Sequence, residues 1–505
     1  MIFFVQAVSG GMRSALIHAR YETIALIIKL QYEGRAMSIL SVLNDANHVN
    51  GKREAVRQTL RDKGVEFLLA RFVDIHGTPK VKQVPVDCFD DLVDSGAGFA
   101  GGAVWGLGQG PESHDMMARS DLDTFVQLPW KPNVAVASCD IYVDDEPWPF
   151  CARTNLKRMM DLFAREGFLL NGGFEPEHFL VVQTPEGSLK PWDPLGVDNL
   201  AKPCYDFRGM SQAMDYLQDI IRYGNQMGFE VYQSDHEDAN GQYEINFGWT
   251  NALFAADRLT LFRMMAGQVA ARYGATCTFM AKPFNDKTGS GAHLHFHVAD
   301  AATGRNLFPA SPSESDPKGL GISATARHYI GGLLKHIRAI TAVASPTINC
   351  YRRIQSGEFV YSSSSGYTWT PAFASFGDNN RTQLLRCPDG KRFEDRSPSG
   401  MVNPYLLMAV HMAAGLDGIR NRIDPGDAII GENVWNLSYD ERRARGMILL
   451  PQNLMEAVEA LEADEVVRSG LGAIADEYIR LKKAEWTEFM RQVTPWEVGR
   501  YLTLL

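Results

Sequence analysis

Five glutamates and one histidine between positions 174 and 396 lie in short motifs typical of a metal-dependent active site. Several carboxylates brought together suit hard divalent cations such as Mg²⁺ or Mn²⁺. Such ions most often serve enzymes that transfer phosphoryl groups. The residues are Glu175, Glu177, Glu237, Glu244, His293 and Glu394.

The spacing of the glutamates indicates how they could meet. Glu175 and Glu177 alternate, so in a strand both side chains would point to one face. An isolated Glu-x-Glu is more often a solvated strand face, but the apolar residues around this pair indicate a buried strand. Glu237 and Glu244 flank an Asn-Gly turn dipeptide, and a hairpin there would bring both carboxylates to one site.

Histidines and arginines add ligands of other kinds. His293, His295 and His297 alternate after a Gly-Ser-Gly segment, where the backbone can approach a ligand closely. No fourth soft ligand stands near them in the sequence, as a zinc site would require. Arginines offer planar forks for carboxylate and phosphate oxygens, although surface ion pairs are the ordinary alternative. They are Arg352, Arg353, Arg381, Arg386, Arg392 and Arg396.

Composition excludes several classes of protein. The chain has 505 residues and a net charge of -10, which argues against a general nucleic-acid binder. Its seven cysteines form no CxxC pair, which favours reduced thiols and a cytoplasmic location. No apolar run is long enough to cross a membrane. Neither a Walker A loop nor a GxGxxG fingerprint occurs, so phosphate handling would rest on metals and arginines.

The expected elements place these motifs in an α+β protein of two domains. A helix over 54–63, a hairpin of strands over 65–74 and 80–86, and a strand over 135–143 predict a mostly β domain at 50–148. Residues 149–505 form the predicted catalytic domain. Residues 1–36 are interpreted as an N-terminal extension or a wrongly assigned start, because Met37 opens a more usual N-terminus. Helices are expected over 153–166, 210–227, 252–274, 323–343, 403–420 and 452–493, and strands over 173–183, 229–234, 242–248, 276–282, 291–299 and 382–386.

Taken in order, the motifs resemble the glutamine synthetase family from about Gly64 to Asp427. The resemblance implies a small N-terminal β-grasp domain and a large glutamine-synthetase-type α/β catalytic domain. It also implies homo-oligomeric rings, a dodecamer in the family, with active sites between neighbouring subunits. The matching stretches are 174–177, 236–244, 282–284, 289–295, 349–353, 380–381, 393–396 and 403–406.

By position, the resemblance also implies roles for individual residues. The co-substrate ATP would phosphorylate the γ-carboxylate of glutamate, and ammonia or a small amine would then displace phosphate. At least two Mg²⁺ or Mn²⁺ ions are implied, one held by Glu177, Glu237 and Glu244, the other by Glu175, His293 and Glu394. Gly289, His293, Arg353 and Arg396 match glutamate-binding positions. His295, Arg381, Arg386 and Arg392 match ATP-binding positions, and Arg381 and Glu358 match catalytic ones.

Departures from the family pattern lie on the amine side. The family's ammonium pocket carries Phe-Asp-Gly-Ser-Ser, but here Ala100 replaces the Asp and Ala103 the second Ser. A corner lined by methyl groups suits methylamine better than ammonium. Thr288 replaces an Asn, and the flap glutamate, Glu358, is shifted by one. The sequence therefore predicts an ATP-dependent glutamate–amine ligase with methylamine favoured, similar to the divergent bacterial branch that includes γ-glutamylmethylamide synthetases and type III glutamine synthetases.

Three other functions stay open at this stage. A plain glutamine synthetase would use ammonia. An ATP:guanido phosphotransferase would need a reactive cysteine in a matching motif, and none is found. A catalytically inactive relative could act as a scaffold or regulator, although such decay should have removed some of the metal-type residues.

Overall fold

The computed structural model describes residues 46–313, 319–354 and 370–504, in two compact units, Met1–Asp62 and Lys63–Leu505. The described part of the first unit is helix α3, Ala46–Asp62. The sequence predicts this helix over 54–63 only, and its true start at Ala46 corrects that expectation. Residues 1–36 lie outside the described part, and the expected domain boundaries stay a prediction.

A seven-stranded sheet begins the second unit. Its order is β2-β1-β6-β4-β3, and β5 and β7 pair with β6. The predicted hairpin and the predicted strand over 135–143 are confirmed: β1 runs antiparallel to β2 and parallel to β6. The strands are β1 Phe67–Val73, β2 Pro79–Pro85, β3 Ala97–Phe99, β4 Met116–Ser120, β5 Val126–Gln127, β6 Val134–Val143 and β7 Glu146–Pro147, with helix α4 at Phe89–Asp94.

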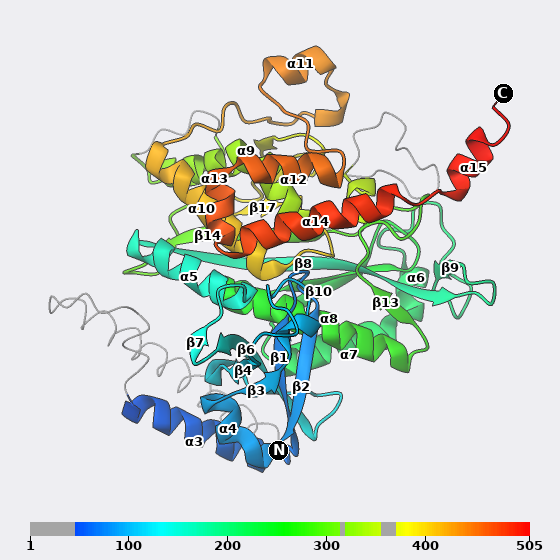
Figure 1. The fold of residues 1–505 in the computed structure, drawn as a ribbon. Coiled ribbons are helices and arrows are strands. Elements are labelled where there is room, and N and C mark those ends of the chain that lie inside the picture. The colour runs from blue at the N-terminus through cyan, green and yellow to red at the C-terminus, as the bar shows by residue number, and fades with distance from the viewer. Residues whose placement is uncertain (1–45, 314–318, 355–369, 505) are drawn as a thin grey trace, which may run out of the picture. The chain divides into compact units, whose positions relative to one another are not determined.

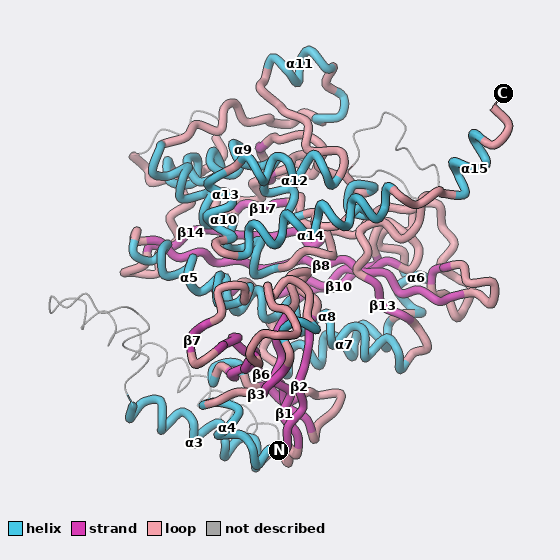
Figure 2. The backbone as a smooth tube through the Cα atoms, in the orientation of Figure 1, coloured by secondary structure: helices cyan, strands magenta, loops and turns pink. Residues whose placement is uncertain are grey.

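A ten-stranded sheet forms the centre of the rest. Its order is β10-β11-β8-β14-β17-β16-β15, and β9, β12 and β13 also pair with β8. Figures 1 and 2 show α9, α10 and α12–α14 above this sheet and α7 and α8 below it. The strands are β8 Phe168–Gln183, β9 Leu189–Pro191, β10 Val231–His236, β11 Gln242–Phe247, β12 Thr250–Asn251, β13 Thr276–Thr278, β14 Ala292–Asp300, β15 Phe376–Gly377, β16 Leu385–Arg386 and β17 Phe393–Asp395.

The expected helix over 452–493 is interrupted twice and forms three helices. The first break is at Asp464. Its side chain accepts hydrogen bonds from the N–H groups of Val466 and Val467 and so caps the start of a new helix. Gly472, at φ +58°, separates the next pair. No helix in the described ranges is long and apolar enough to cross a membrane. The helices are α5 Ala152–Arg165, α6 Phe207–Gln212, α7 Met214–Gln226, α8 Ala252–Arg272, α9 Ala324–Ala344, α10 Pro404–Asn421, α11 Tyr439–Ala444, α12 Leu454–Ala463, α13 Glu465–Leu471, α14 Ile474–Met490 and α15 Pro495–Tyr501.

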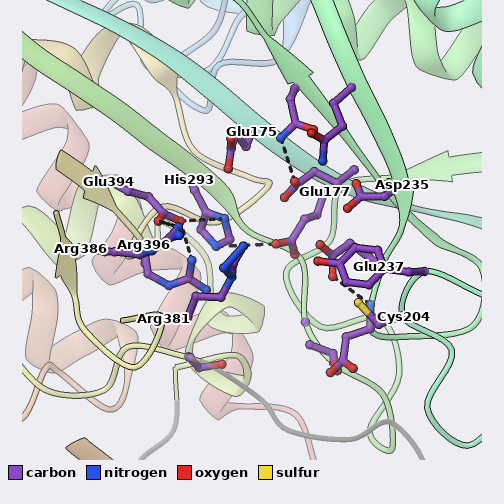
Figure 3. Close-up of a pocket in the computed structure, with 18 of the residues that line it drawn as sticks. Glu175, Glu177, Cys204, Asp235, Glu237, His293, Arg381, Arg386, Glu394 and Arg396 are labelled. Carbon is purple, nitrogen blue, oxygen red and sulfur yellow. Dashed lines mark hydrogen bonds and ion pairs between the residues drawn. The ribbon is translucent and has the colours of Figure 1, made fainter. Parts of the chain in front are cut away.

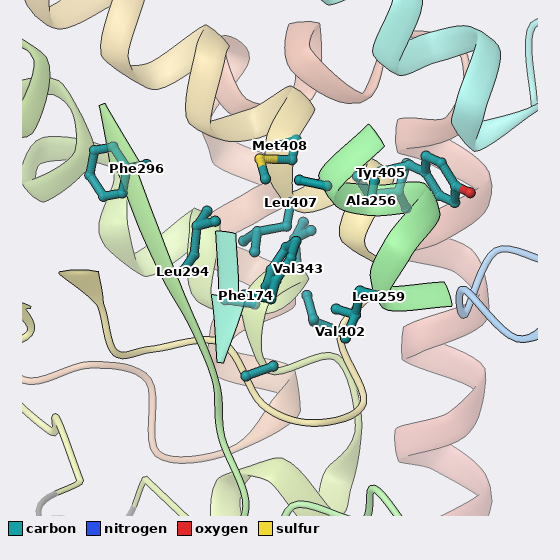
Figure 4. Packing of buried hydrophobic residues seen from close by; sticks show 14 of the residues in the cluster. Phe174, Ala256, Leu259, Leu294, Phe296, Val343, Val402, Tyr405, Leu407 and Met408 are labelled. Carbon is teal, nitrogen blue, oxygen red and sulfur yellow. The ribbon is translucent and has the colours of Figure 1, made fainter. Parts of the chain in front are cut away.

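Strand alternation separates the hydrophobic core from the polar face of the central sheet. Phe174 on β8 and Leu294 and Phe296 on β14 are buried with Val343 and Met408 of the covering helices (Figure 4). Successive strand side chains point to opposite faces. The residues between these apolar positions, among them the predicted ligands, are therefore turned away from the core.

A buried arginine joins the seven-stranded sheet to the helices of the catalytic part. Arg153 on α5 donates to Asp140 on β6 at 2.9 Å, to Asp121 at 2.9 Å and to Asp257 on α8 at 3.0 Å. Tyr405 on α10 donates to the same Asp257 at 2.7 Å. Burial raises the pKa of Asp121 and Asp257, but the charge of Arg153 outweighs burial and holds the pKa of both below the usual range.

Replacing this arginine by a residue without charge should destabilise the protein. Arg153→Met leaves three buried carboxylates without their shared cation, and we expect a loss of about 3–5 kcal/mol in the free energy of unfolding at pH 7. Because the folded pKa values are depressed, the stabilisation is present above the unfolded pKa of about 4 and is lost as pH falls below it. Urea unfolding from pH 7 to pH 3 measures both effects.

The control is Arg165→Met, an exposed position on the same helix, where we expect a change within about 0.5 kcal/mol. Equal stability of Arg153→Met and wild type at pH 7 would contradict the prediction.

Candidate active site

The predicted ligands line one cavity of about 260 Å³ on the polar face of the ten-stranded sheet. Figure 3 shows most of the carboxylates on one side of this cavity, and the arginines with Glu394 on the other. The six residues singled out first in the sequence converge there, together with Gly289, Arg353, Arg381, Arg386, Arg392 and Arg396. Glu358 lies outside the described residues.

The register of the strands explains this convergence. Glu177 on β8 stands opposite Glu244 on β11, and Glu244 stands opposite Asp235 on β10. Residues directly opposite each other in a sheet have Cβ atoms about 4.5–5.5 Å apart. The turn of the β10–β11 hairpin, with Gly241 at φ +76°, returns Glu244 to the neighbourhood of Glu237. Three strands thereby place their carboxylates in one patch.

A second part of the site continues across β14. His293 stands opposite Glu175 on β8, and His295 stands opposite Glu394 on β17. Nδ1 of His293 lies 3.6 Å from Oε1 of Glu394, and its Nε2 lies 3.6 Å from Oε1 of Glu177. Nε2 of His295 lies 3.1 Å from Oε2 of Glu175. His297, which shares this face, instead contacts the Trp249 ring.

Among the described residues, three groups have potential ligand atoms within 4.8 Å of one another. One group, Glu177 with Glu237 and Glu244, has the composition that the resemblance implies for one metal. The other implied triad does not form such a group. In one of the remaining two groups, His295 joins Glu175 and Glu394. In the other, Glu244 joins Glu175 and His293.

The electrostatics of the carboxylates fit a binding site for cations. Burial, together with the charges of Glu177 and Asp235, raises the pKa of Glu237 well above its usual range. Burial and the charges of Glu237 and Glu175 do the same to the pKa of Glu244. Ionised groups in this arrangement repel one another, and a divalent cation between them removes that cost. A hard oxygen donor set of this kind suits Mg²⁺ or Mn²⁺.

The opposite side of the cavity is balanced by arginines. Arg386 donates to Oε2 of Glu394 at 2.6 Å, and Arg396 donates to its Oε1. Burial raises the pKa of Glu394, but Arg396 and His293 outweigh it and hold that pKa well below the usual range. Arg353 donates to the carbonyl oxygens of Ser397 and Arg396 at 3.1 and 3.0 Å. These hydrogen bonds fix three guanidinium groups at this wall.

Several residues of the cavity wall lie outside the set that the sequence predicts. Asp235 lies two residues before Glu237, so the alternation that singled out Glu175 and Glu177 also pointed to it. Its Oδ1 is buried without a hydrogen-bond partner in the described structure, and burial with the charge of Glu175 raises its pKa to about 6. Cys204, Tyr205 and Tyr232 also line the cavity. No sequence pattern marked those three.

Ala100 and Ala103, which replace polar residues of the family's ammonium pocket, do not line this cavity. Ala100 follows β3, and Ala103 ends the short 3₁₀ helix η2, Gly101–Ala103. Within the described chain, the cavity is lined by residues from Glu175 to Arg396 only, so neither alanine reaches it in a single subunit. Thr288 does line the cavity, and it donates to Oδ2 of Asp238 at 2.7 Å.

Comparison with known proteins connects this geometry to a family. The model of the glutamine synthetase β-grasp domain matches residues 64–144, and that of the glutamine synthetase catalytic domain matches residues 149–501. The chain belongs to the glutamine synthetase family. The expected fold, a small β-grasp domain and a large catalytic domain of helices and sheets, is thereby confirmed.

Relatives in this family differ in the amine that their names report. The glutamate–methylamine ligase of Methyloversatilis universalis is 43% identical over 447 residues, which cover 88% of this chain and 98% of that protein. The glutamine synthetase of Rhizobium meliloti is 38% identical, covering 86% of this chain and 96% of that protein. A solved GmaS/ADP complex is 40% identical with a TM-score of 0.81, covering 88% of this chain and 99% of that one.

Removing one carboxylate from the cluster should separate cation binding from stability. Glu244→Gln takes away a ligand atom, and we expect Mn²⁺ affinity to fall at least about tenfold, since even indirect partners of a metal contribute that much. Because the pKa of Glu244 is raised, its ionised form destabilises the fold at pH 8. The variant should therefore melt at a higher temperature than wild type without metal.

Electron paramagnetic resonance of Mn²⁺ and thermal melts in a chelator measure the two effects. Glu230→Gln, exposed beside the same hairpin, serves as the control that changes neither. Unchanged Mn²⁺ affinity in Glu244→Gln would remove this residue from the metal site.

Proposed function

We propose that this protein is an ATP-dependent ligase that joins a small amine, with methylamine favoured, to the γ-carboxylate of glutamate through γ-glutamyl phosphate. The observation that carries the proposal is the convergence, in one cavity of a glutamine synthetase family member, of a carboxylate cluster with five arginines. The name of the 43% identical relative supports methylamine as the amine.

The arginines of the cavity suit two anionic substrates. We assign Arg353 and Arg396 to the carboxylates of glutamate, beside Gly289 and His293, and Arg381, Arg386 and Arg392 to the phosphates of ATP, beside His295. Glu394 orients Arg386 and Arg396 by accepting from both. Holding two anions side by side removes much of the entropic barrier to their reaction.

The six ligands of the sequence analysis would hold two or more divalent ions, which when bound neutralise charge on the transferring phosphoryl group. A γ-carboxylate oxygen of glutamate forms a bond to the γ-phosphorus while the bond to ADP breaks. The amine nitrogen then bonds to the acyl carbon, phosphate leaves and the amine loses a proton. The arginines stabilise the charge that develops on the phosphoryl oxygens. We keep Arg381 and Glu358 as the proposed catalytic residues.

The position of the segment that would bind the amine favours an assembly of several subunits. The Ala100–Ala103 segment does not line the cavity of its own chain, so we propose that a neighbouring subunit supplies it, in rings such as the dodecamer. A cytoplasmic location is proposed with it. The second candidate, a glutamine synthetase that uses ammonia, is favoured by the name of the 38% identical relative.

Initial rates of ADP release with glutamate and a series of amines test the proposal. We expect kcat/KM for methylamine to exceed that for ammonia by about tenfold or more, because one methyl group in an apolar pocket discriminates by about 10–200-fold. Ala100→Asp should shift the preference toward ammonia by restoring the carboxylate of the family pattern. A wild-type preference for ammonia over every alkylamine would overturn the choice of methylamine, and no glutamate-dependent ADP release would overturn the ligase.

A further inference from the structure

A fully buried lysine lies behind the wall that carries Arg353. The side chain of Lys482 on α14 is 0% exposed. Its Nζ donates to Oε2 of Glu485 at 2.9 Å and to Nδ1 of His76 at 3.2 Å, and it lies 5.6 Å from the centroid of the Tyr478 ring. A buried lysine is a weak source of stability, because desolvation offsets the attraction of its partner.

The imidazole fixes one end of this network. His76 lies in the turn between β1 and β2, where its backbone N–H donates to Oδ1 of Asp74 at 3.0 Å. Burial and the charge of Lys482 lower the pKa of His76 to about 4. The ring is therefore neutral at physiological pH, and its Nδ1 accepts a hydrogen bond from the ammonium group. The lysine is thus anchored to the seven-stranded sheet.

The carboxylate of Glu485 carries the network to the active site. Its Oε1 accepts from the backbone N–H of Ile348 at 3.2 Å. Ile348 is the first residue of the 3₁₀ turn η4, Ile348–Arg352, and Arg353 follows directly. The first N–H groups of a helical turn lack partners within the turn, so an acceptor there fixes where the turn begins. Arg353 is tied to the same turn by its N–H, which donates to the carbonyl of Cys350 at 2.9 Å.

Packing does not hold this turn on its outer side. A cavity of about 400 Å³ lies there, lined by Thr347, Ile348, Asn349 and Arg352 of the turn segment and by Glu485 and Phe489 of α14. Asn349 adds a polar restraint, because its side chain pairs with the backbone of Lys282 at 2.8 and 2.9 Å, and Sγ of Cys350 lies 3.1 Å from Oγ of Ser399. Cys350 and Tyr351 pack the inner side of the turn into the core, and on the open outer side hydrogen bonds restrain it.

We propose that Lys482 and Glu485 are positioning residues for Arg353: they hold η4 in place and thereby set the guanidinium of Arg353 in the active-site cavity. The inference rests on the proposed role of Arg353 in binding glutamate. Glutamate binding depends on this network, and ATP binding does not, because the arginines assigned to the phosphates belong to other segments.

Steady-state kinetics of Lys482→Met test this positioning. We expect the KM for glutamate to rise about 10–100-fold, since a displacement of about 1 Å at a reacting group costs up to that much. The KM for ATP should be unchanged, and kcat should fall less than the KM for glutamate rises. Lys483→Met is the matched control: this neighbour pairs with Glu462 at the surface and should leave every constant unchanged.

Two variants of Glu485 separate positioning from charge. Glu485→Gln retains the Oε1 acceptor for Ile348, and Glu485→Ala removes it. We expect the KM for glutamate to rise strongly in Glu485→Ala and much less in Glu485→Gln. The double variant Lys482→Met with Glu485→Gln leaves no unpaired charge and keeps the acceptor, so it should recover much of the lost glutamate affinity.

A purely structural network gives a different result. Lower melting temperatures with parallel changes in the KM for glutamate and for ATP would overturn the proposal, and so would equal effects of Glu485→Ala and Glu485→Gln. Should Lys482→Met not fold, the Glu485 pair decides alone. Wild-type turnover and Arg353→Lys test the proposed function itself, and calorimetry of glutamate binding to Lys482→Met tests the positioning separately.

Discussion

Carboxylates that share a buried cavity repel one another, and the arrangement of the whole catalytic part follows from holding them together nonetheless. The repulsion is reduced in different ways on the two sides of the cavity. Around Glu394, protein cations are already in place and its pKa is low. Around Glu237 and Glu244 the pKa values are high, because burial and the charges of the neighbouring carboxylates both oppose ionisation. The charge of Glu394 is thus balanced by the protein itself, and the cluster around Glu237 and Glu244 fits the divalent ions of the proposed function.

The constraint explains which parts of the site the sequence predicted. Glu175 and Glu177 alternate on a strand between apolar residues, and the Asn-Gly turn formed the expected hairpin with Glu244. Those signals are local, so sequence periodicity reveals them. Which histidine meets which glutamate depends on the register of β14 against β8 and β17, which no local pattern encodes. Asp235 obeyed the same alternation and was overlooked, whereas Asp464, which divides the last expected helix, acts through a cap that periodicity does not report.

Arg153 and Lys482 are among the buried cations that link the seven-stranded sheet to the catalytic part. Arg153 joins β6 to α5 and α8, and is held by three carboxylates. Lys482 joins the β1–β2 turn to α14, and its partner Glu485 contacts the turn that precedes Arg353. The β-grasp sheet is therefore connected to the large domain through charge as well as through apolar packing. The proposed role of Lys482 couples the position of this sheet to the geometry of the site.

The alternation along β14 determines which mutations this strand can tolerate during evolution. Odd-numbered residues from His293 to His297 face the polar side, and the even-numbered Leu294 and Phe296 belong to the core. Selection can act on the two sets independently, so drift among the core residues leaves the reacting groups in place. An insertion or deletion of one residue in this strand would exchange the two sets in a single step, so length variation should be purged there far more strongly than substitution.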